Sequence, residues 1–472
     1  MDSRTQLRFL PLVFASLAAA ALVATGCSSG SNLSNITNPA AQTGSSFVVG
    51  TDAPMASVVS FAVQIQSVNA INASGTSVPL ISGTPTVDFA RFNGLQTLLD
   101  MNDIPADTYT SIQITLGAAN IGYLNTTAGA APTITTEPAI YPQSASTFTV
   151  TKTLATPLVI TQSGTPVGIH MDFDLRKSIG VDSTGAITGD VTPTFNINTV
   201  ANSDPGAYID EFVAAVVTVS TTGQSFTIQG PHGRQFTVNV TGQTEWENND
   251  SISSLSSSSI VEISGDLDRA DATIDADDIA ILSQNGFYAS GQITYVTPSS
   301  GPATSFDLYV RGLLPTTTGL SLGQIAQVDL SGNENYFIYW WHNPLTQFLF
   351  NSSQLLPGQH VSIGGPATGA ANANDVTVKR VVLRHWGFNG TVVPGSQNSA
   401  NGTFQMKING FAGLLVPQTV TVYTIPGTKW RDGLADMANI ADGANVRVVG
   451  LLLKAPGSGN TVLLGHYIDA LN

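Results

Sequence analysis

Short runs in which apolar and polar residues alternate dominate this chain and limit what it can fold into. The apolar positions are rich in β-branched residues, as in Val58–Val68, Thr110–Leu116, Phe212–Val219, Phe236–Val240 and Val446–Leu453. Gly, Pro, Asn and Ser separate the runs at short intervals, and no long helical period follows residue 46. Such alternation is typical of strands with one buried face. The sequence therefore predicts an all-β protein, with a single short helical segment at Phe92–Met101.

Composition narrows the class of protein further. Hydrophobic residues make up 42% of the 472 residues, which is enough to form several cores and excludes wholesale disorder. Lys and Arg total 17 against 32 acidic residues, giving a net charge of −15, so we expect no nucleic-acid partner. One cysteine excludes internal disulfides and structural zinc sites built on several thiolates.

The N-terminus has the pattern of a secretory signal. Arg4 and Arg8 precede an apolar run, Phe9–Val23, which is too short for a transmembrane helix. The residues Ala24-Thr25-Gly26-Cys27 resemble a bacterial lipobox, which implies removal of residues 1–26 as a lipoprotein signal peptide and lipidation of Cys27. Each buried CH₂ of an acyl chain stabilises membrane attachment by about 0.8 kcal/mol.

A tether is expected between the lipid and the folded body. Residues 27–45 are rich in Ser, Asn, Thr and Gly, a composition typical of flexible linkers. Ser28, directly after the cysteine, is similar to the residue found in lipoproteins sent to the outer membrane. We therefore expect a membrane-anchored extracytoplasmic protein at the outer membrane, facing either the surface or the periplasm.

The C-terminal part contains a repeat in three stretches. Each stretch has an opening strand, a Phe-centred strand, a tryptophan and a closing hairpin whose first strand reaches glycine: Val261–Gly265, Val361–Gly365 and Val446–Gly450. The recurring tryptophans are Trp246, Trp340 with Trp341, and Trp430. Each repeat unit is long enough to form a hydrophobic core of its own. We therefore expect tandem small β-barrel-like domains at residues 205–285, 286–384 and 385–472.

These residues carry two family resemblances. The repeat unit, best in its first copy, resembles the bacterial domain of unknown function 5666. The segment 46–204 resembles domain of unknown function 4382, through Thr51-Asp52-Ala53-Pro54, Val87-Asp88-Phe89, Ile104–Ile112 and Met171–Ile179. The second resemblance implies an N-terminal β-sandwich of extracytoplasmic type, and it implies no activity.

An acidic stretch suggests a possible calcium site. Asp266, Asp268, Asp271, Asp275 and Asp277 alternate with other residues before an apolar strand. Calcium takes six to eight hard oxygen ligands, and the stretch is similar to a dockerin-type loop. Ala272 stands where such a loop has its turn glycine, and the other repeat copies have plain hairpins here. The sequence therefore favours a solvated hairpin, with calcium as the alternative and no other cofactor.

An aromatic run supplies the second candidate site. The segment Tyr336–Trp341 contains Tyr336, Tyr339, Trp340 and Trp341, and alternate residues of a strand face opposite sides. One face must fill a core. The other face is either an exposed platform on which sugar rings stack or a surface covered by a neighbouring domain.

No convergent catalytic set is visible in the sequence. The six histidines include no pair at ligand spacing on one element, and Asp172 and Asp174 suit an ion pair with Arg176 or the closure of a turn. We therefore expect a non-catalytic binding or scaffold protein of the cell envelope, with a polysaccharide or another envelope protein as partner. A glycan-processing enzyme with carboxylates on separate loops and a calcium-stabilised structural module are the alternatives.

Overall fold

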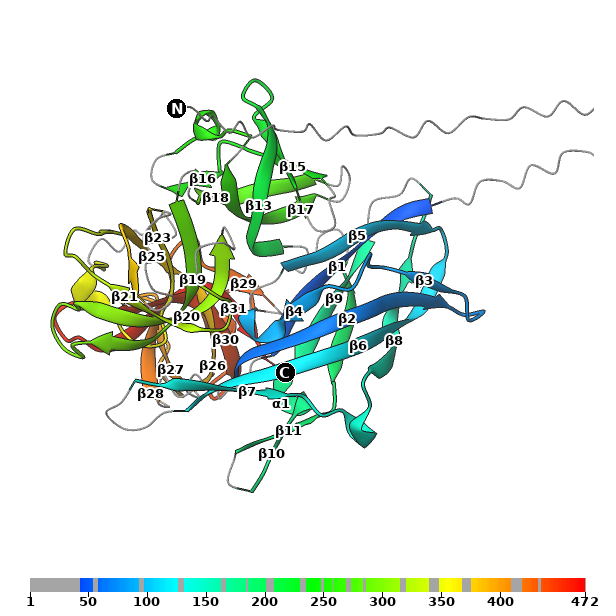
Figure 1. The fold of residues 1–472 in the computed structure, drawn as a ribbon, viewed down its shortest axis with the longest axis horizontal. Coiled ribbons are helices and arrows are strands. Elements are labelled where there is room, and N and C mark those ends of the chain that lie inside the picture. Colours follow the sequence, from blue (N-terminus) through cyan, green and yellow to red (C-terminus); the bar gives the residue numbers. More distant parts are fainter. Residues whose placement is uncertain are drawn as a thin grey trace, which may run out of the picture. The chain divides into compact units, whose positions relative to one another are not determined.

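A computed structural model describes residues 43–53, 58–92, 97–125, 131–162, 167–183, 186–200, 208–229, 235–247, 250–257, 259–268, 273–282, 286–314, 320–338, 348–366, 375–408, 418–431 and 434–471. Residues 41–472 make one compact unit, which contains all of these ranges (Figure 1). Cys27 and the predicted signal peptide and tether up to residue 42 lie outside the described residues.

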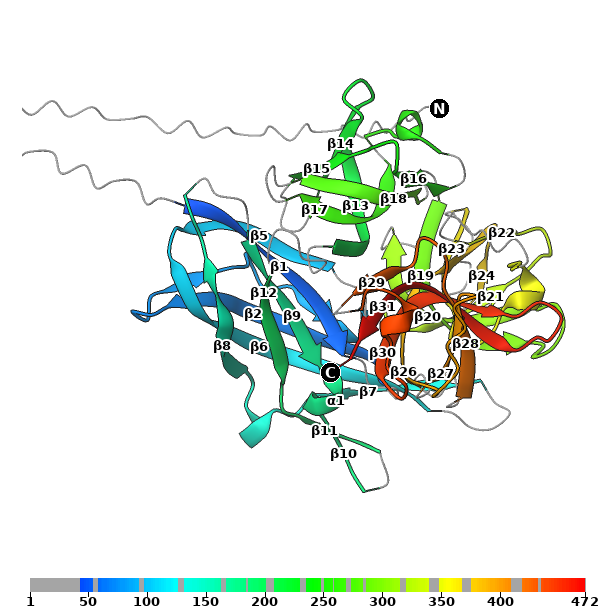
Figure 2. The same ribbon diagram turned by 180° about the vertical axis from the view of Figure 1, so that it is seen from behind.

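The N-terminal part is a β-sandwich. Its first sheet has the order β12-β9-β1-β5 (Figure 2), and its second has the order β3-β2-β6-β7, with β4 paired to β2 and β8 to β6. The first sheet comprises β1 (Thr43–Ala53), β5 (Thr97–Pro105), β9 (Val167–Asp174) and β12 (Phe195–Val200). The second comprises β2 (Val58–Asn72), β3 (Ser77–Pro79), β4 (Thr86–Asp88), β6 (Thr108–Asn125), β7 (Thr133–Pro138) and β8 (Phe148–Val159). A separate hairpin joins β10 (Ile179–Val181) to β11 (Ile187–Val191).

The sandwich core follows directly from strand alternation. In β2 the residues Phe61, Val63 and Ile65 are fully buried, and the residues between them are partly exposed. Phe61 stacks against Phe173 of the opposite sheet, with ring centroids 4.9 Å apart. Phe173 in turn meets the edge of Phe195 at 4.6 Å. These rings join the two sheets through one continuous apolar layer.

Three small sheets follow, and they share one topology. The first has the order β15-β14-β13-β17-β18-β16, and a parallel pairing of β15 with β18 closes five of its strands into a barrel. Its strands are β13 (Tyr208–Ser220), β14 (Ser225–Gln229), β15 (Gln235–Asn239), β16 (Glu245–Trp246), β17 (Ile260–Asp268) and β18 (Thr273–Ile281).

The third barrel repeats this arrangement strand by strand. Its order is β28-β27-β26-β30-β31-β29, closed by the parallel pairing of β28 with β31. Its strands are β26 (Trp386–Val392), β27 (Thr403–Ile408), β28 (Gln418–Tyr423), β29 (Lys429–Arg431), β30 (Asn445–Lys454) and β31 (Thr461–Ala470).

The second barrel differs in one respect. The strand equivalent to β18 is divided into β24 (Asp375–Thr377), which pairs with β21, and β25 (Arg380–Arg384), which pairs with β22 and β23. The remaining strands are β19 (Gly286–Thr297), β20 (Ser305–Leu314), β21 (Ile325–Asp329), β22 (Asn335–Ile338) and β23 (His360–Pro366). A 3₁₀ turn precedes the same strand in each barrel: η6 (Ile252–Ser254), η7 (Ser352–Gln354) and η8 (Met437–Asn439). The predicted all-β class, a sandwich followed by three barrel-like units, is confirmed, and the first and third of these units are closed by the pairings β15–β18 and β28–β31.

The expected helix at Phe92–Met101 is wrong. Residues from Thr97 onward form strand β5, which pairs with β1. Residues 93–96 lie outside the described ranges, and among the described neighbours only η1 (Phe89–Arg91) is helical. Leu99 is buried in the sandwich core, so its spacing reflects packing of a strand rather than a helical face. The other helical segments of the sandwich are η2 (Pro142–Ser144) and α1 (Leu175–Ser178). Among the described residues, no helix has the length and apolar character needed to cross a membrane.

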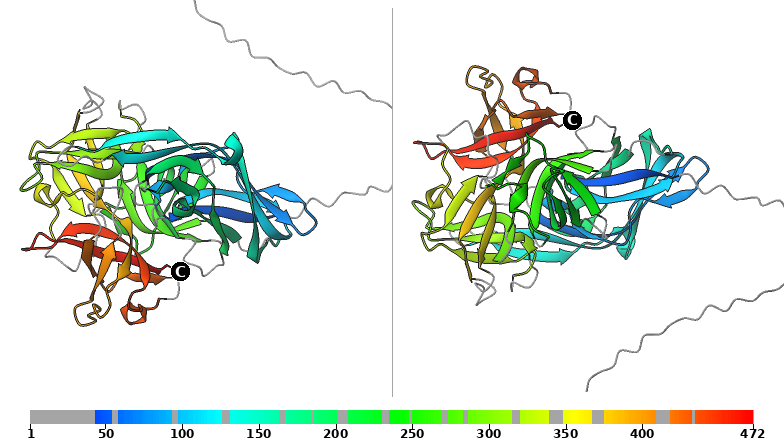
Figure 3. Two further views of the ribbon diagram at one scale, coloured as in Figure 1. Left: turned by 90° about the horizontal axis from the view of Figure 1, so that it is seen from below. Right: turned by 90° about the horizontal axis from the view of Figure 1, so that it is seen from above.

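The hydrophobic clusters run from one sheet into the next. Phe47 and Val200 of the sandwich belong to the core of the first barrel. Val59 and Leu124 of the sandwich belong to the core of the third. The tip of the β30–β31 hairpin, drawn in red in Figure 3, contributes four side chains to the core of the second barrel: Leu451, Leu453, Val462 and Leu464. The barrels are therefore packed units of one body.

Candidate functional site

The predicted acidic residues lie on the β17–β18 hairpin of the first barrel. Asp266 and Asp268 are on β17, where Asp266 pairs in register with Asp275 of β18. The Asn239 side-chain amide donates to Asp275 Oδ1 at 2.8 Å, and Asp277 Oδ2 lies 2.6 Å from Lys429 Nζ of the third barrel. These two carboxylates are thus engaged by groups of the protein. Asp271 lies outside the described residues, and within those residues no three ligand-type side chains are arranged to hold a metal ion.

Carboxylates close to this hairpin are harder to ionise than usual. Burial raises the pKa of Glu245 to about 8, and the negative charges of Asp278 and Asp277 add to that rise. Burial also raises the pKa of Asp266, while Lys429 nearby acts in the opposite direction. The hairpin is therefore a partly desolvated acidic surface that faces cationic residues of the third barrel.

Only one residue of the predicted stacking platform can be placed. Tyr336 lies on β22, is half-buried and packs against the core of the second barrel, with its ring edge-on to Phe350 at 5.8 Å. Its neighbour Phe337 faces the other way, beneath the Arg380 guanidinium at 5.1 Å. Tyr339, Trp340 and Trp341 lie outside the described residues, so an exposed platform stays a prediction.

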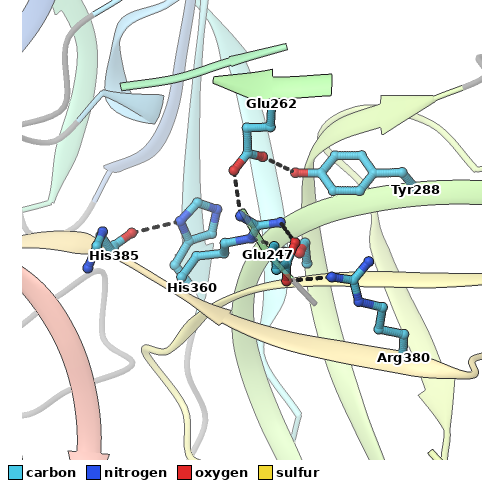
Figure 4. A network of polar contacts seen from close by, with 8 residues as sticks. Glu247, Glu262, Tyr288, His360, Arg380 and His385 are labelled. Carbon is cyan, nitrogen blue, oxygen red and sulfur yellow. Dashed lines mark hydrogen bonds and ion pairs between the residues drawn. The ribbon is translucent and has the colours of Figure 1, made fainter. Parts of the chain in front are cut away.

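A buried ionic network joins the first barrel to the second (Figure 4). Arg384 Nη1 of β25 donates to Glu262 Oε1 of β17 at 2.5 Å, and the Tyr288 hydroxyl of β19 donates to Glu262 Oε2 at 2.8 Å. Glu262 is 1% exposed and Arg384 is 2% exposed. Ions buried this deeply need partners, because their desolvation costs several kcal/mol per ion.

The network extends to a second pair of charges. Arg384 Nε donates to Ser362 Oγ at 2.9 Å, and Arg384 Nη2 lies 3.9 Å from Glu247 Oε2. Glu247 also forms an ion pair with Arg380. Two glutamates of the first barrel therefore face two arginines of the second.

Strand alternation places these charges on the outer faces of the barrels. In β17, Val261 and Ile263 point into the first barrel, so Glu262 between them points out. In β25, Val381 and Leu383 point into the second barrel, so Arg384 points out. This network was not among the sequence-based predictions. The one sequence feature that could have indicated it is a charged residue within an otherwise apolar strand. Such a residue is equally consistent with an outer face exposed to solvent.

Three buried histidines lie close to the same region. His360 Nδ1 is 3.0 Å from the backbone oxygen of His385, and burial lowers the pKa of both imidazoles to about 3. His385 stacks on His466 of β31 with ring centroids 4.6 Å apart, and burial lowers the pKa of His466 as well. All three rings are neutral at pH 7. They belong to the packing between barrels, while His342 lies outside the described residues.

A cavity of about 690 Å³ opens beside the ionic network. Apolar residues from both barrels line it: Ile281, Leu282, Phe287, Ile363 and Val382. Tyr288, Ser362 and Arg384 line it as well, together with Lys379, Arg380 and Asp250. A cleft of this volume, largely apolar with a few polar groups, has the size and character of small-molecule sites in proteins.

The aspartates of the sandwich have a structural role. Asp174 Oδ1 accepts from the backbone N–H of Lys177 at the start of α1, and Asp174 Oδ2 forms an ion pair with Lys177 Nζ at 2.7 Å. Of the two expectations, an ion pair with Arg176 or the closure of a turn, the contact of Asp174 with the backbone of Lys177 fits the second. Asp172 Oδ2 accepts from the Asn196 amide at 3.1 Å across β9 and β12. The contacts of both carboxylates are those of a helix cap and a strand pair.

Comparison with known proteins identifies two segments of the chain. Residues 45–188 match the family Domain of unknown function (DUF4382), and residues 214–280 match the family Domain of unknown function (DUF5666). No match is found among curated proteins. Among solved structures, "drosophila Unr CSD456" is 8% identical, with 56% of this chain and 97% of that chain covered, but its TM-score of 0.14 is too low to relate the folds.

The two matches agree with the order of the motifs and with the sheets described above. The first match spans most of the sandwich, and the second spans the strands of the first barrel. Residues 45–188 are therefore similar to DUF4382 and residues 214–280 to DUF5666, in the order that the sequence motifs predict.

Proposed function

We propose that this chain is a lipid-anchored protein of the bacterial cell envelope that works as a non-catalytic scaffold and binding protein. The observation that carries the proposal is the sharing of hydrophobic cores among the sandwich and the three barrels. Shared cores resist relative motion of the units, because any displacement exposes apolar surface at about 25 cal/mol per Å². A rigid body of this kind can present several outer faces in fixed geometry.

The anchor is the second part of the proposal. Its support is the basic start at Arg4 and Arg8, the apolar run and the lipobox-like residues that end at Cys27. Acyl chains on Cys27 would hold the body at the outer membrane, facing the surface or the periplasm. The expected partners are an envelope polysaccharide or another envelope protein, because the acidic composition disfavours nucleic acid.

Protease accessibility on intact cells tests the anchor and its location. Wild-type protein is expected in the membrane fraction, and the Cys27→Ala variant in a soluble fraction. Digestion of the wild type on intact cells places the body at the surface, whereas protection until the outer membrane is opened places it in the periplasm. A Cys27→Ala variant that stays with the membrane would overturn the lipid anchor.

Co-sedimentation tests the binding role. Purified full-length protein is mixed with isolated envelope polysaccharide, and the fraction that sediments is measured at low and high salt. Binding that saturates supports the proposal. Absence of saturable binding to any envelope fraction, polysaccharide or protein, would overturn it.

A further inference from the structure

The cavity between the first and second barrels is built from elements far apart in sequence. One wall is the end of β18 with Ile281 and Leu282, and the other is formed by β23 and β25 of the second barrel. Its volume of about 690 Å³ falls within the range of small-molecule sites in proteins.

The apolar wall is preformed. Leu282, Tyr288 and Val382 pack together in one cluster that bridges the two barrels. Tyr288 is held by its hydrogen bond to Glu262, so its ring cannot swing into the cavity without breaking that bond. An apolar ligand would therefore meet a surface that needs no reordering.

Basic residues outnumber acidic ones on the cavity lining, in contrast to the chain as a whole. Acidic residues outnumber basic ones by 32 to 17 overall, yet the cavity is lined by Lys379, Arg380 and Arg384 and by one acid, Asp250. The two arginines are neutralised by Glu247 and Glu262. Lys379 is exposed, and within the described part of the chain its ammonium group has no ion pair. This cation at the mouth is thus available to an incoming anion.

We propose that the cavity binds an organic anion with an apolar body. The anionic group lies near Lys379 and Arg380, and the apolar body lies along Leu282 and Val382. Asp250 on the lining disfavours a second anionic group, so the ligand carries its negative charge at one end. This site does not depend on the lipid anchor or on polymer binding.

Gly364 allows the cavity to be filled without disturbing the barrel. It lies on β23 beside Ile363, which points into the second barrel, so a side chain at position 364 points out toward the cavity. An added Cβ would meet only the Phe287 backbone oxygen, at 3.4 Å, which is an ordinary contact. Gly242, where an added Cβ meets nothing within 4 Å, provides the matched control.

The test uses two fluorescent probes and the purified full-length protein. The anionic probe is 8-anilino-1-naphthalenesulfonate, and the neutral probe is N-phenyl-1-naphthylamine, which lacks the sulfonate. Gly364→Leu should weaken binding of both probes by about tenfold or more, while Gly242→Leu should bind as wild type does. Lys379→Met should weaken only the anionic probe, by about two- to fivefold, as expected for an exposed ion pair. Lys407→Met, an exposed lysine on β27, controls for net charge.

Each part of the proposal can fail separately. Wild-type probe binding by a folded Gly364→Leu variant would overturn the cavity as the site. If Gly364→Leu does not fold, Lys379→Glu takes its place, because Lys379 is exposed and its substitution leaves the core intact. Unchanged binding of the anionic probe to Lys379→Glu would overturn the assignment of an anion.

Discussion

The junction between the first and second barrels differs sharply from the junction between the second and third. At the first junction, Glu262 and Arg384 form a buried ion pair beside a cavity. At the second, leucines of β30 and β31 enter the core of the second barrel directly. The first and third barrels share one strand order, and the second differs from them only in the division of one strand, so we attribute the contrast to side chains rather than to topology.

One pair of equivalent positions makes the contrast concrete. In the first barrel, Asp275 of β18 pairs with Asn239 of β15; in the third, Leu464 of β31 pairs with Tyr423 of β28 in the same register. The residue before each, Ile274 or Leu463, points into its own barrel. Asp275 is partly exposed and Leu464 is fully buried. The neighbour that covers the outer face thus decides which residue that face carries.

The two junctions also differ in what they contribute to the stability of the protein. Apolar contact stabilises in proportion to the area removed from water and tolerates small shifts. A buried ion pair adds little net stability over an apolar pair, yet loss of one partner is costly. We therefore interpret the apolar junction between the second and third barrels as the larger contribution to stability. The ionic junction between the first and second barrels instead fixes how those two barrels are oriented.

Exchanging the two equivalent residues is the strongest way to break the comparison. Leu464→Asp should cost more than about 4 kcal/mol in the free energy of unfolding, because it buries an unpaired carboxylate and removes a packed side chain. The reciprocal change, Asp275→Leu, should cost only about 1 kcal/mol, the value of its hydrogen bond from Asn239. Urea unfolding of both variants measures the difference. Equal costs would mean that the two outer faces are not differently covered.

Removing one ion of the buried pair should cause the next largest loss in the free energy of unfolding. Arg384→Met is expected to cost about 3–5 kcal/mol in the free energy of unfolding, because Glu262 is left buried without its partner. The double variant Arg384→Met with Glu262→Leu should recover most of that loss. If the double variant is as unstable as the single one, the cost lies in packing rather than in charge.

Acid should weaken the second junction through its histidines. The pKa of His385 is about 3 in the folded protein and near 6.5 when unfolded, so its stabilising contribution is present above pH 6.5 and is lost as the pH falls toward 3. The expected loss is roughly 1.4 kcal/mol per pH unit below 6.5 for this residue. Thermal unfolding between pH 7 and pH 4 should show a flatter pH dependence for His385→Asn than for wild type. His170→Asn, on β9 of the sandwich, is the control. An equal pH dependence of the melting temperature in the His385→Asn and His170→Asn variants would contradict the role of His385.

The ion pair between the first and third barrels should contribute less to stability than the buried pair does. Lys429 and Asp277 are 45% and 41% exposed, so Lys429→Ala should cost about 0.2–1 kcal/mol in the free energy of unfolding. This small difference should vanish in 1 M salt, where the Debye length is about 3 Å. A cost that persists in high salt would instead point to the contact of the Lys429 ammonium group with the Tyr467 ring, whose centroid lies 5.6 Å from Nζ.

Calcium is expected to have the smallest effect of all. Asp277 is paired with Lys429 and Asp275 with Asn239, so binding would first require these contacts to break. The melting temperature should be the same with millimolar calcium and with chelator. A rise in melting temperature with calcium that is lost in an Asp266→Asn variant would instead support the alternative of a calcium-stabilised structural module.

Much of the fold could be predicted because it depends on local pattern. The runs at Val58–Val68 and Thr110–Leu116 are strands β2 and β6, and the Val-rich runs that end in glycine are β17, β23 and β30. The helix at Phe92–Met101 was expected from the spacing of Leu95, Leu98 and Leu99. That prediction failed because such spacing also fits a strand with a bulge, and the pairing of β1 with β5 has one between Val48 and Val49.

The all-β class, the order of the sandwich and the barrels, and the inward face of each strand can all be read from the sequence, because alternation within a strand is a local property of the chain. Only the tertiary structure decided which outer faces are buried. Glu262 and Arg384 are 122 residues apart, and neither strand carries a sign that the other will cover it. The pairing of the charges, the low pKa of the histidines and the cavity all follow from that long-range packing.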